Sequence, residues 1–201
     1  MEIKSTRVYG LEESIVASGY PMLTKVPTEA EFNRQATEIS IAITDNTSTP
    51  HIERAKKLGS SPGNSGHPNF LKGIIVQADV TAPQYWWMQA QRYHWFDIVS
   101  SQSKMHKILE GDFGYCEYTD ETPMVYTAEI IKLHKDSCCS FEDVLANTPM
   151  GLETTARIST NYLQLKNMYQ QRKNHRLYMW NTVFREFVES LEYTKELGVV
   201  N

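Results

Sequence analysis

Hydrophobic and polar residues alternate most regularly between residues 73 and 81, where the sequence is Gly-Ile-Ile-Val-Gln-Ala-Asp-Val-Thr. Ile74, Val76, Ala78 and Val80 share one face, and this period of two predicts a strand with one buried side. Residues 2–9 are predicted to form a second, shorter strand. Most of the remaining chain favours helices.

The predicted helices rest on helical spacing of apolar residues and on start signals. Thr28 is predicted to cap a helix over 29–43, with Glu31 at the capping-box position. The strongest amphipathic pattern, over 176–196, predicts a C-terminal helix. Further helices are predicted over 12–18, 51–58, 126–135, 140–146 and 152–171, and from Pro83 onward.

The breaks between these elements are polar or rich in glycine. Residues 59–68 hold three glycines, two prolines and three serines, and predict a loop. Residues 100–103 form a polar break, and 107–122 are irregular. Few strands and many helices indicate an α+β protein. A length of 201 residues suits one domain, 1–201.

Composition narrows the class of protein. The net charge of −4 argues against a general nucleic-acid binder, which usually carries a basic excess. No window approaches 18 apolar residues, so no membrane span is expected, and the N-terminus lacks the apolar core of a secretory signal. The three cysteines include a vicinal pair and make a poor disulfide framework. A reducing, cytoplasmic location is therefore expected.

Familiar catalytic and metal motifs are missing. The chain has no phosphate-binding glycine-rich loop, no Cys-x-x-Cys and no His-Glu-x-x-His. Five residues could be interpreted either as a metal cluster or as ordinary core and surface residues. The ordinary interpretation is favoured, because the spacings of these residues match no zinc pattern. These residues are His106, Cys116, His134, Cys138 and Cys139.

Polar residues gather first between Gln89 and His106. Gln89 and Arg92 are three apart and are expected on one face of the helix that follows Pro83. A helix end followed by serines and a lysine offers hydroxyls, backbone N–H groups and a charge to an anion. A polar helix face with a solvated turn is the alternative. The neighbouring aromatic residues, within 85–96, are expected in the core or an interface.

A second concentration spans residues 170–176, Gln-Gln-Arg-Lys-Asn-His-Arg. Four of these seven residues are basic, which in an acidic protein favours a patch that binds phosphate or another anion. Cations that complement the dipole at a helix C-terminus explain the run equally well.

These concentrations, with the strand before the first, resemble the flavin-dependent thymidylate synthase family. The family pattern is a strand ending in Ala-Pro, a helix, and then Arg-His-Arg-x-x-Ser-x-Asn-x-x-Ser-x-Arg. Here Ala82-Pro83 precedes the helix, and Arg92-Tyr93-His94 occupies the Arg-His-Arg position without a gap. The motif ends as Ser-Ser-Gln-Ser-Lys over 100–104, so that Lys104 takes the place of the final arginine.

The C-terminal half carries the resemblance independently. The family has a proline followed by asparagines 12 and 18 residues on and an arginine 23 on; from Pro149 these are Asn161, Asn167 and Arg172. Further positions similar to the family's are His67, Ser18 and either His175 or Arg176.

The resemblance implies an α+β fold in which a small, mostly antiparallel sheet packs with several long helices. It further implies a cytoplasmic homotetramer with active sites shared between subunits. The reaction would be reductive methylation of dUMP at C5, a methyltransferase step of nucleotide biosynthesis. Methylenetetrahydrofolate would supply the carbon, FAD the hydride, and NADPH would reload the flavin.

The resemblance also implies residue roles. The nucleotide would be bound by Gln89 and Arg92, with its phosphate on the loop Ser101, Gln102, Ser103 and Lys104. Arg172 would contact the uracil edge and stabilise negative charge that develops on the ring, and is the expected catalytic residue. The positions expected to contact flavin are Ser18, His67, His94, Asn161, Asn167 and His175.

Several positions depart from the family pattern. They are Tyr93, His94, Asp97, Val99, Gln102 and Leu145, the last replacing an arginine four residues before Pro149. Lys104 keeps a positive charge but lacks the guanidinium fork. Two alternatives therefore stand beside thymidylate synthesis: an enzyme with another nucleotide or cofactor, for example a pyrimidine hydroxymethylase, and a catalytically silent oligomeric binding protein.

Overall fold

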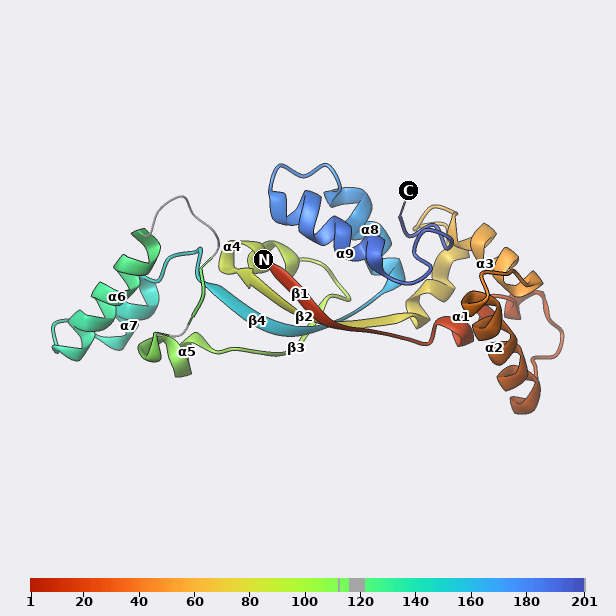
Figure 1. Ribbon diagram of the computed structural model, residues 1–201, viewed down its shortest axis with the longest axis horizontal. Coiled ribbons are helices and arrows are strands. Elements are labelled where there is room, and N and C mark those ends of the chain that lie inside the picture. Colours follow the sequence, from red (N-terminus) through yellow and green to blue (C-terminus); the bar gives the residue numbers. More distant parts are fainter. Residues whose placement is uncertain (112, 116–121, 201) are drawn as a thin grey trace. The chain divides into compact units, whose positions relative to one another are not determined.

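The computed structural model describes residues 1–111, 113–115 and 122–200 (Figure 1). Its strands are β1 (Glu2–Tyr9), β2 (Ile75–Pro83), β3 (Asp97–Ser101) and β4 (Glu153–Asn161). Its α-helices are α1 (Leu11–Ala17), α2 (Glu29–Thr44), α3 (Pro50–Gly59), α4 (Gln84–Ala90), α5 (Lys104–Lys107), α6 (Thr122–Lys135), α7 (Phe141–Ala146), α8 (Tyr162–Arg172) and α9 (Arg185–Ser190). Three described segments are 3₁₀ helices, η1 (Tyr20–Met22), η2 (His67–Gly73) and η3 (Ile108–Glu110), and η4 (Met179–Phe184) is a π-helix.

The chain divides into two compact units. Unit 1 comprises Met1–Ser5 and Ala78–Ile158, and unit 2 comprises Thr6–Gln77 and Ser159–Asn201. A single domain over 1–201 remains a prediction. Cys116 and part of the irregular segment expected over 107–122 lie outside the described residues.

A four-stranded sheet has the order β1-β2-β4-β3. The hydroxyls of Thr81 and Thr155 are 2.7 Å apart, and Arg157 Nη1 lies 3.0 Å from Asp79 Oδ1. Moving from Thr81 back to Asp79 on β2 therefore corresponds to moving from Thr155 forward to Arg157 on β4, so these two strands run antiparallel. The α+β fold with a small antiparallel sheet is confirmed.

In unit 2, short helices pack around an aliphatic core. α1 packs against α2 and η2, and α8 packs against η2 and α9. The capping box predicted for α2 is present: Thr28 Oγ1 accepts from the Glu31 N–H, and Glu31 accepts from the Thr28 N–H. The fully buried core side chains of this unit include Ile15, Ile39, Ile52, Leu71 and Ile74.

Two glycines in unit 2 allow the C-terminal segment to fold back onto the end of α3. A Cβ at Gly59 would lie 2.3 Å from the Leu197 carbonyl oxygen. Gly198 has φ +63°, and a Cβ there would lie 2.8 Å from Ser60 Cα. Leu197 and Val199 are fully buried, so the segment is part of the core. Neither glycine position has room for a side chain.

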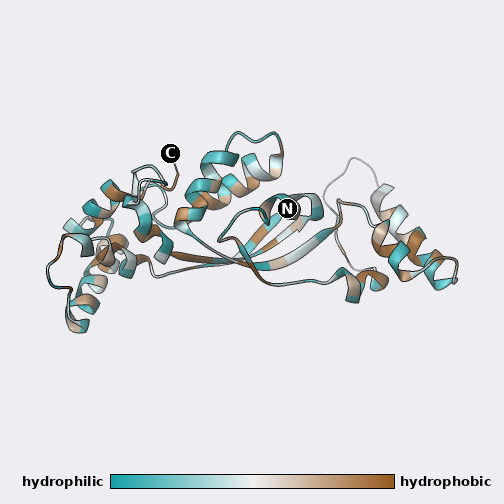
Figure 2. Cartoon of the chain, turned by 180° about the vertical axis from the view of Figure 1, so that it is seen from behind, coloured by the Kyte–Doolittle hydropathy of each residue, from teal (hydrophilic) through white to brown (hydrophobic). Residues whose placement is uncertain are grey.

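Unit 1 carries an apolar cluster formed by residues of η3, α6 and α7 and by the residue before β4. Ile108, Ile131, Val144 and Leu152 are buried together, and Phe141 packs against them. The apolar residues of α6 and α7 are visible in Figure 2. Ser140 caps α7 with a capping box to Asp143, which explains why the predicted helix begins where it does.

Three of the aromatic residues after Pro83 lie in the core, namely Trp86, Trp87 and Phe96, whereas Tyr85 and Tyr93 are half-buried. Trp86 is fully buried, with its ring 5.1 Å from Trp87 and 6.2 Å from Phe96 in edge-on geometry. Trp95 is exposed, with φ +65° in the turn that follows α4. Large aromatics in edge contact stabilise a core beyond their buried area.

The predicted helix over 152–171 was wrong in its first half. Residues 153–161 form β4, and only Tyr162–Arg172 is helical. Ala156, Ile158 and Thr160 alternate as buried positions, and β-branched residues suit a pleated strand. The predicted C-terminal helix also ended too late, since α9 ends at Ser190 and Leu191 is extended.

Two smaller corrections concern the segment that follows β2. α4 ends at Ala90, so Arg92 lies in the turn after it and does not share a helix face with Gln89. The polar break expected at 100–103 begins inside β3, whose five residues are all exposed. An edge strand with no buried face lacks the alternation that would have revealed it. Within the described part of the chain, no helix is long and apolar enough to cross a membrane.

Candidate functional site

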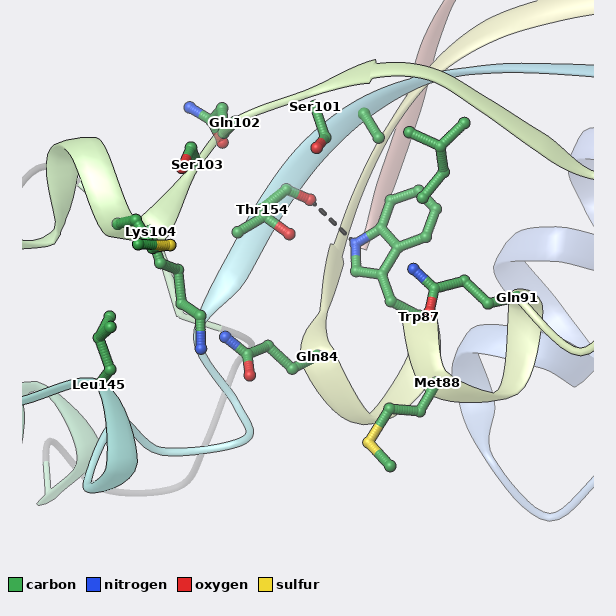
Figure 3. A pocket seen from close by; sticks show the side chains of 13 residues that line it. Gln84, Trp87, Met88, Gln91, Ser101, Gln102, Ser103, Lys104, Leu145 and Thr154 are labelled. Carbon is green, nitrogen blue, oxygen red and sulfur yellow. Dashed lines mark hydrogen bonds between the residues drawn. The ribbon is translucent and has the colours of Figure 1, made fainter. Parts of the chain in front are cut away.

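A cavity of about 490 Å³ lies within unit 1. It is bounded by α4, β3, the start of α5, β4 and one residue of α7 (Figure 3). The lining residues are Gln84, Trp87, Met88, Gln91, Ile98, Ser101, Gln102, Ser103, Lys104, Met105, Leu145, Thr154 and Ala156. Four of the predicted nucleotide-binding residues, Ser101 to Lys104, are therefore together.

The helix α4 presents one face to this cavity. Gln84, Trp87, Met88 and Gln91 follow the spacing i, i+3, i+4, i+7, which places them on a single side of a helix. Trp87 Nε1 donates to the Thr154 carbonyl at 3.1 Å, which fixes the indole against β4 (Figure 3). The cavity wall is thus held by both helix geometry and a hydrogen bond to the sheet.

Lys104 is the one charged side chain among the described residues that line the cavity. Burial lowers its pKa from the ordinary lysine value, because desolvation disfavours the ammonium form. No carboxylate of the described chain forms an ion pair with it. An ammonium group that is partly desolvated and lacks a counter-ion favours an anionic ligand.

Gln102 has another local role. Its backbone N–H donates to the Thr155 carbonyl at 2.9 Å, and its Oε1 accepts from the Thr155 N–H at 2.8 Å. Both bonds extend the pairing of β3 with β4. The N–H of Gln102 is therefore occupied and not directed at a phosphate, whereas the hydroxyls of Ser101 and Ser103 line the cavity.

Gln89 and Arg92 do not line this cavity. Arg92, Tyr93, His94 and Asp97 instead border a second hollow of about 400 Å³, formed by the turn after α4. His94 is exposed and lies edge-on to Trp95, with ring centroids 4.7 Å apart. The roles expected of Gln89, Arg92 and His94 stay predictions.

Ser18 and Asn161, both expected to contact flavin, are engaged within unit 2. Ser18 is buried; its hydroxyl donates to the Ile15 carbonyl at 2.7 Å and accepts from Arg54 Nε at 3.1 Å. Asn161 caps α8, its Oδ1 accepting from the Gln164 N–H at 2.9 Å. These contacts explain both residues by local structure alone.

Replacing Asn161 with alanine is expected to lower the free energy of unfolding by about 1 kcal/mol, the usual cost of a lost N-cap. Asn161→Asp retains a capping oxygen and should remain within a few tenths of a kcal/mol of the wild type. Urea unfolding of the three proteins measures this. Equal destabilisation by both variants would contradict the capping role.

His67 and Asn167 remain available to a ligand in unit 2. His67 is exposed at the first position of η2. Asn167 borders a hollow of about 440 Å³ beside the loop 60–64. The neighbouring Lys166 is buried and donates to the carbonyls of Gly59 and Ser61, which holds this loop against α8.

The predicted basic patch brings Arg172 and His175 together. The guanidinium carbon of Arg172, at the end of α8, lies 4.7 Å from the centroid of the Trp180 ring, a cation–π contact. His175 is edge-on to the same ring at 6.5 Å. Burial, and then the charges of Arg172 and Arg176, lower the pKa of His175 below its usual value. His175 is therefore mainly neutral at neutral pH.

Sequence reasoning missed Gln84. In the sequence Gln84 is an ordinary polar residue at the start of a helix. Only its position beside Lys104 in the cavity identifies it as a candidate site residue. Among the described residues, no group of three or more His, Cys, Asp or Glu side chains is arranged to hold a metal ion.

The fold is that of the flavin-dependent thymidylate synthases. Two solved structures of the flavin-dependent thymidylate synthase ThyX from Helicobacter pylori, both complexed with FAD and dUMP, superpose on the chain. One has a TM-score of 0.74 at 11% identity and covers 99% of this chain and 98% of its own. The other has a TM-score of 0.73 at 12% identity, with 99% and 97% covered. No protein-family model and no curated protein sequence matches.

Proposed function

We propose that the cavity of unit 1 binds a pyrimidine nucleotide, with dUMP as the first candidate. Lys104 carries this proposal, because it is the one charged group among the described lining residues and has no carboxylate partner. Its ammonium would receive the phosphate. At another part of the cavity, the amide of Gln91 beside the Trp87 indole offers both a donor and an acceptor to the edge of a base (Figure 3).

The proposed reaction is reductive methylation of dUMP at C5. The likeness in fold to synthases that bind FAD and dUMP supports it. Methylenetetrahydrofolate would donate the carbon, and NADPH would supply the reducing equivalents. The family resemblance implies active sites shared between subunits, in which Arg172, with its guanidinium over the Trp180 ring, would stabilise negative charge on the pyrimidine ring.

The residues of unit 2 fit a flavin through neutral hydrogen-bonding groups. Asn167 on the rim of its hollow offers an amide complementary to the carbonyl and N–H edge of a flavin ring, and His67 is exposed. Bound FAD would supply the hydride. Ser18 and Asn161 would support this surface indirectly, since their hydrogen bonds are made within the protein.

The decisive experiment measures the two ligands separately and then the reaction. Calorimetric titration with dUMP tests the nucleotide cavity, and the absorbance between about 350 and 500 nm before and after addition of FAD tests the flavin. Formation of dTMP from dUMP, NADPH and methylenetetrahydrofolate tests catalysis. Absence of both dUMP binding and flavin absorbance would refute the proposal.

A second candidate keeps the fold and the cavity but takes another nucleotide. Leu145 and Met88 line the cavity, so part of its wall is apolar. Cations at these positions would bind a phosphate more strongly than these apolar side chains do. A titration series with dUMP, dCMP, UMP and dTMP separates the candidates. Preference for any nucleotide other than dUMP favours the second.

We also propose that residues 1–201 form a single domain and that the protein assembles as a homotetramer. The aligned structures cover 99% of the chain, which supports treating 1–201 as one folding entity. Light scattering coupled to size-exclusion chromatography measures the assembly. A monomeric mass at micromolar concentration would contradict the tetramer.

Affinity for dUMP is expected to fall on the alkaline side at a lower pH than an exposed lysine would give. Burial lowers the pKa of Lys104, so its charge is present below that pKa and is lost as the pH rises through it. Lys104→Arg should remove this loss, because arginine stays protonated. Dissociation constants for both proteins across pH 6.5–10 test the difference; identical profiles would contradict it.

A further inference from the structure

Gln84 has a buried hydrogen-bond donor without an acceptor. Its Nε2 atom is shielded from solvent and has no hydrogen-bond partner among the described residues. A buried amide N–H group that lacks an acceptor destabilises the protein, and such groups are rare in native structures. The side chain lines the cavity of unit 1, so a bound ligand is one source of the missing acceptor.

Lys104 brings a second donor to the same part of the cavity. The ammonium of Lys104 and the amide of Gln84 point toward one another in Figure 3. Two facing donors cannot bond to each other. An anion placed between them would accept from both, which pairs the Gln84 amide and neutralises the Lys104 charge in one step.

The surroundings restrict the size of this anion. Leu145 and Met88 supply apolar surface nearby, and no second cation lines the cavity among the described residues. One terminal phosphate with several acceptor oxygens matches two donors. A diphosphate or triphosphate would bring further negative charges into a cavity whose described lining holds a single cation, and burial of an unpaired charge is costly.

We infer that Gln84 is a specificity-determining residue that, together with Lys104, clamps the terminal phosphate of a nucleoside monophosphate. This inference rests on the proposed function for the identity of the nucleotide, but the clamp itself requires only an oxyanion. The neutral amide of Gln84 donates a hydrogen bond to the anion, whereas a carboxylate at the same position would repel the anion.

The test compares two variants of the full chain, Gln84→Met and Gln84→Glu. Methionine keeps the approximate length and volume of the side chain and removes the donor; glutamate reverses the local charge. We expect Gln84→Met to weaken dUMP binding about tenfold and Gln84→Glu about 100-fold. Binding of 2′-deoxyuridine, which lacks the phosphate, should change less than about twofold. Gln35→Met in α2 is the matched control, and a cooperative melting transition no lower than that of the wild type establishes that each variant is folded.

The outcomes separate this inference from the proposed function. Unchanged dUMP affinity in both Gln84 variants, or an equal loss for 2′-deoxyuridine, would overturn the clamp while nucleotide binding stands. Inorganic phosphate is the independent probe. If the wild type binds phosphate but not dUMP, and Gln84→Met weakens phosphate binding, the clamp stands and the nucleotide assignment fails. If the wild type binds neither, both are overturned.

Discussion

Replacing Lys104 with alanine is expected to weaken dUMP binding by about 10- to 100-fold. A hydrogen bond to a charged group contributes roughly 1.5–3 kcal/mol, and no other cation among the described lining residues can compensate for its loss. Calorimetric titration of dUMP at neutral pH measures the effect. The loss should be smaller for 2′-deoxyuridine, since the phosphate is the group that Lys104 would bind.

Lys107→Ala is the matched control for this experiment. Lys107 lies on the same short helix α5, is exposed, and pairs with Glu110 at 2.8 Å. Its removal should leave dUMP affinity within about twofold, because exposed ion pairs contribute little. Equal affinities for the wild type and Lys104→Ala would rule out Lys104 as the phosphate ligand.

Replacing Trp180 with alanine is expected to lower the free energy of unfolding by about 4 kcal/mol. Trp180 is fully buried in unit 2, and its ring lies 5.1 Å from that of Phe184. Truncation of a buried tryptophan removes its transfer free energy and leaves a large cavity. Arg172 would also lose the ring below its guanidinium, and with it a contact that fixes its position.

The control for Trp180 is Tyr178→Ala. Tyr178 lies two residues away in the same segment and is 67% exposed, so its truncation should cost less than about 0.5 kcal/mol. Urea unfolding followed by far-UV circular dichroism reports both. A similar cost for the two variants would show that Trp180 does not organise this part of unit 2.

The elements that the sequence predicted correctly are those whose signals are local. The capping box at Thr28 and Glu31 defines the start of α2, and the alternation around Val76, Ala78 and Val80 defines β2. These patterns depend on a few neighbouring residues. The fold could be predicted further only through the resemblance, since no local signal specifies the order β1-β2-β4-β3.

β4 was missed because two signals competed. Its strand residues run directly into α8 through the N-cap Asn161, without a glycine or proline between them. The apolar spacing of the helix was therefore extended backward over a strand whose buried face consists of small or β-branched residues. The strand pairs with β2, a partner more than 70 residues away, and no local signal in the sequence reports such a pairing.

The candidate site was predicted in part for a similar reason. Lys104 and the serines beside it could be identified because they form one short polar run that matches a family pattern. Gln84 lies 20 positions earlier and belongs to no polar run, so its relation to Lys104 exists only in three dimensions. Conversely, Ser18 and Asn161 matched by spacing, but their hydrogen bonds to Arg54 and Gln164 are made within the protein.

The close contacts of Gly59 with Leu197 and of Gly198 with Ser60 have an evolutionary consequence. Any side chain at either glycine would displace backbone atoms, so relatives that keep this C-terminal segment must keep both glycines. Such a constraint persists after most other positions have diverged. A relative that folds this segment back in the same way is therefore expected to carry glycine at both positions, even at the 11–12% identity that separates this chain from its structural neighbours.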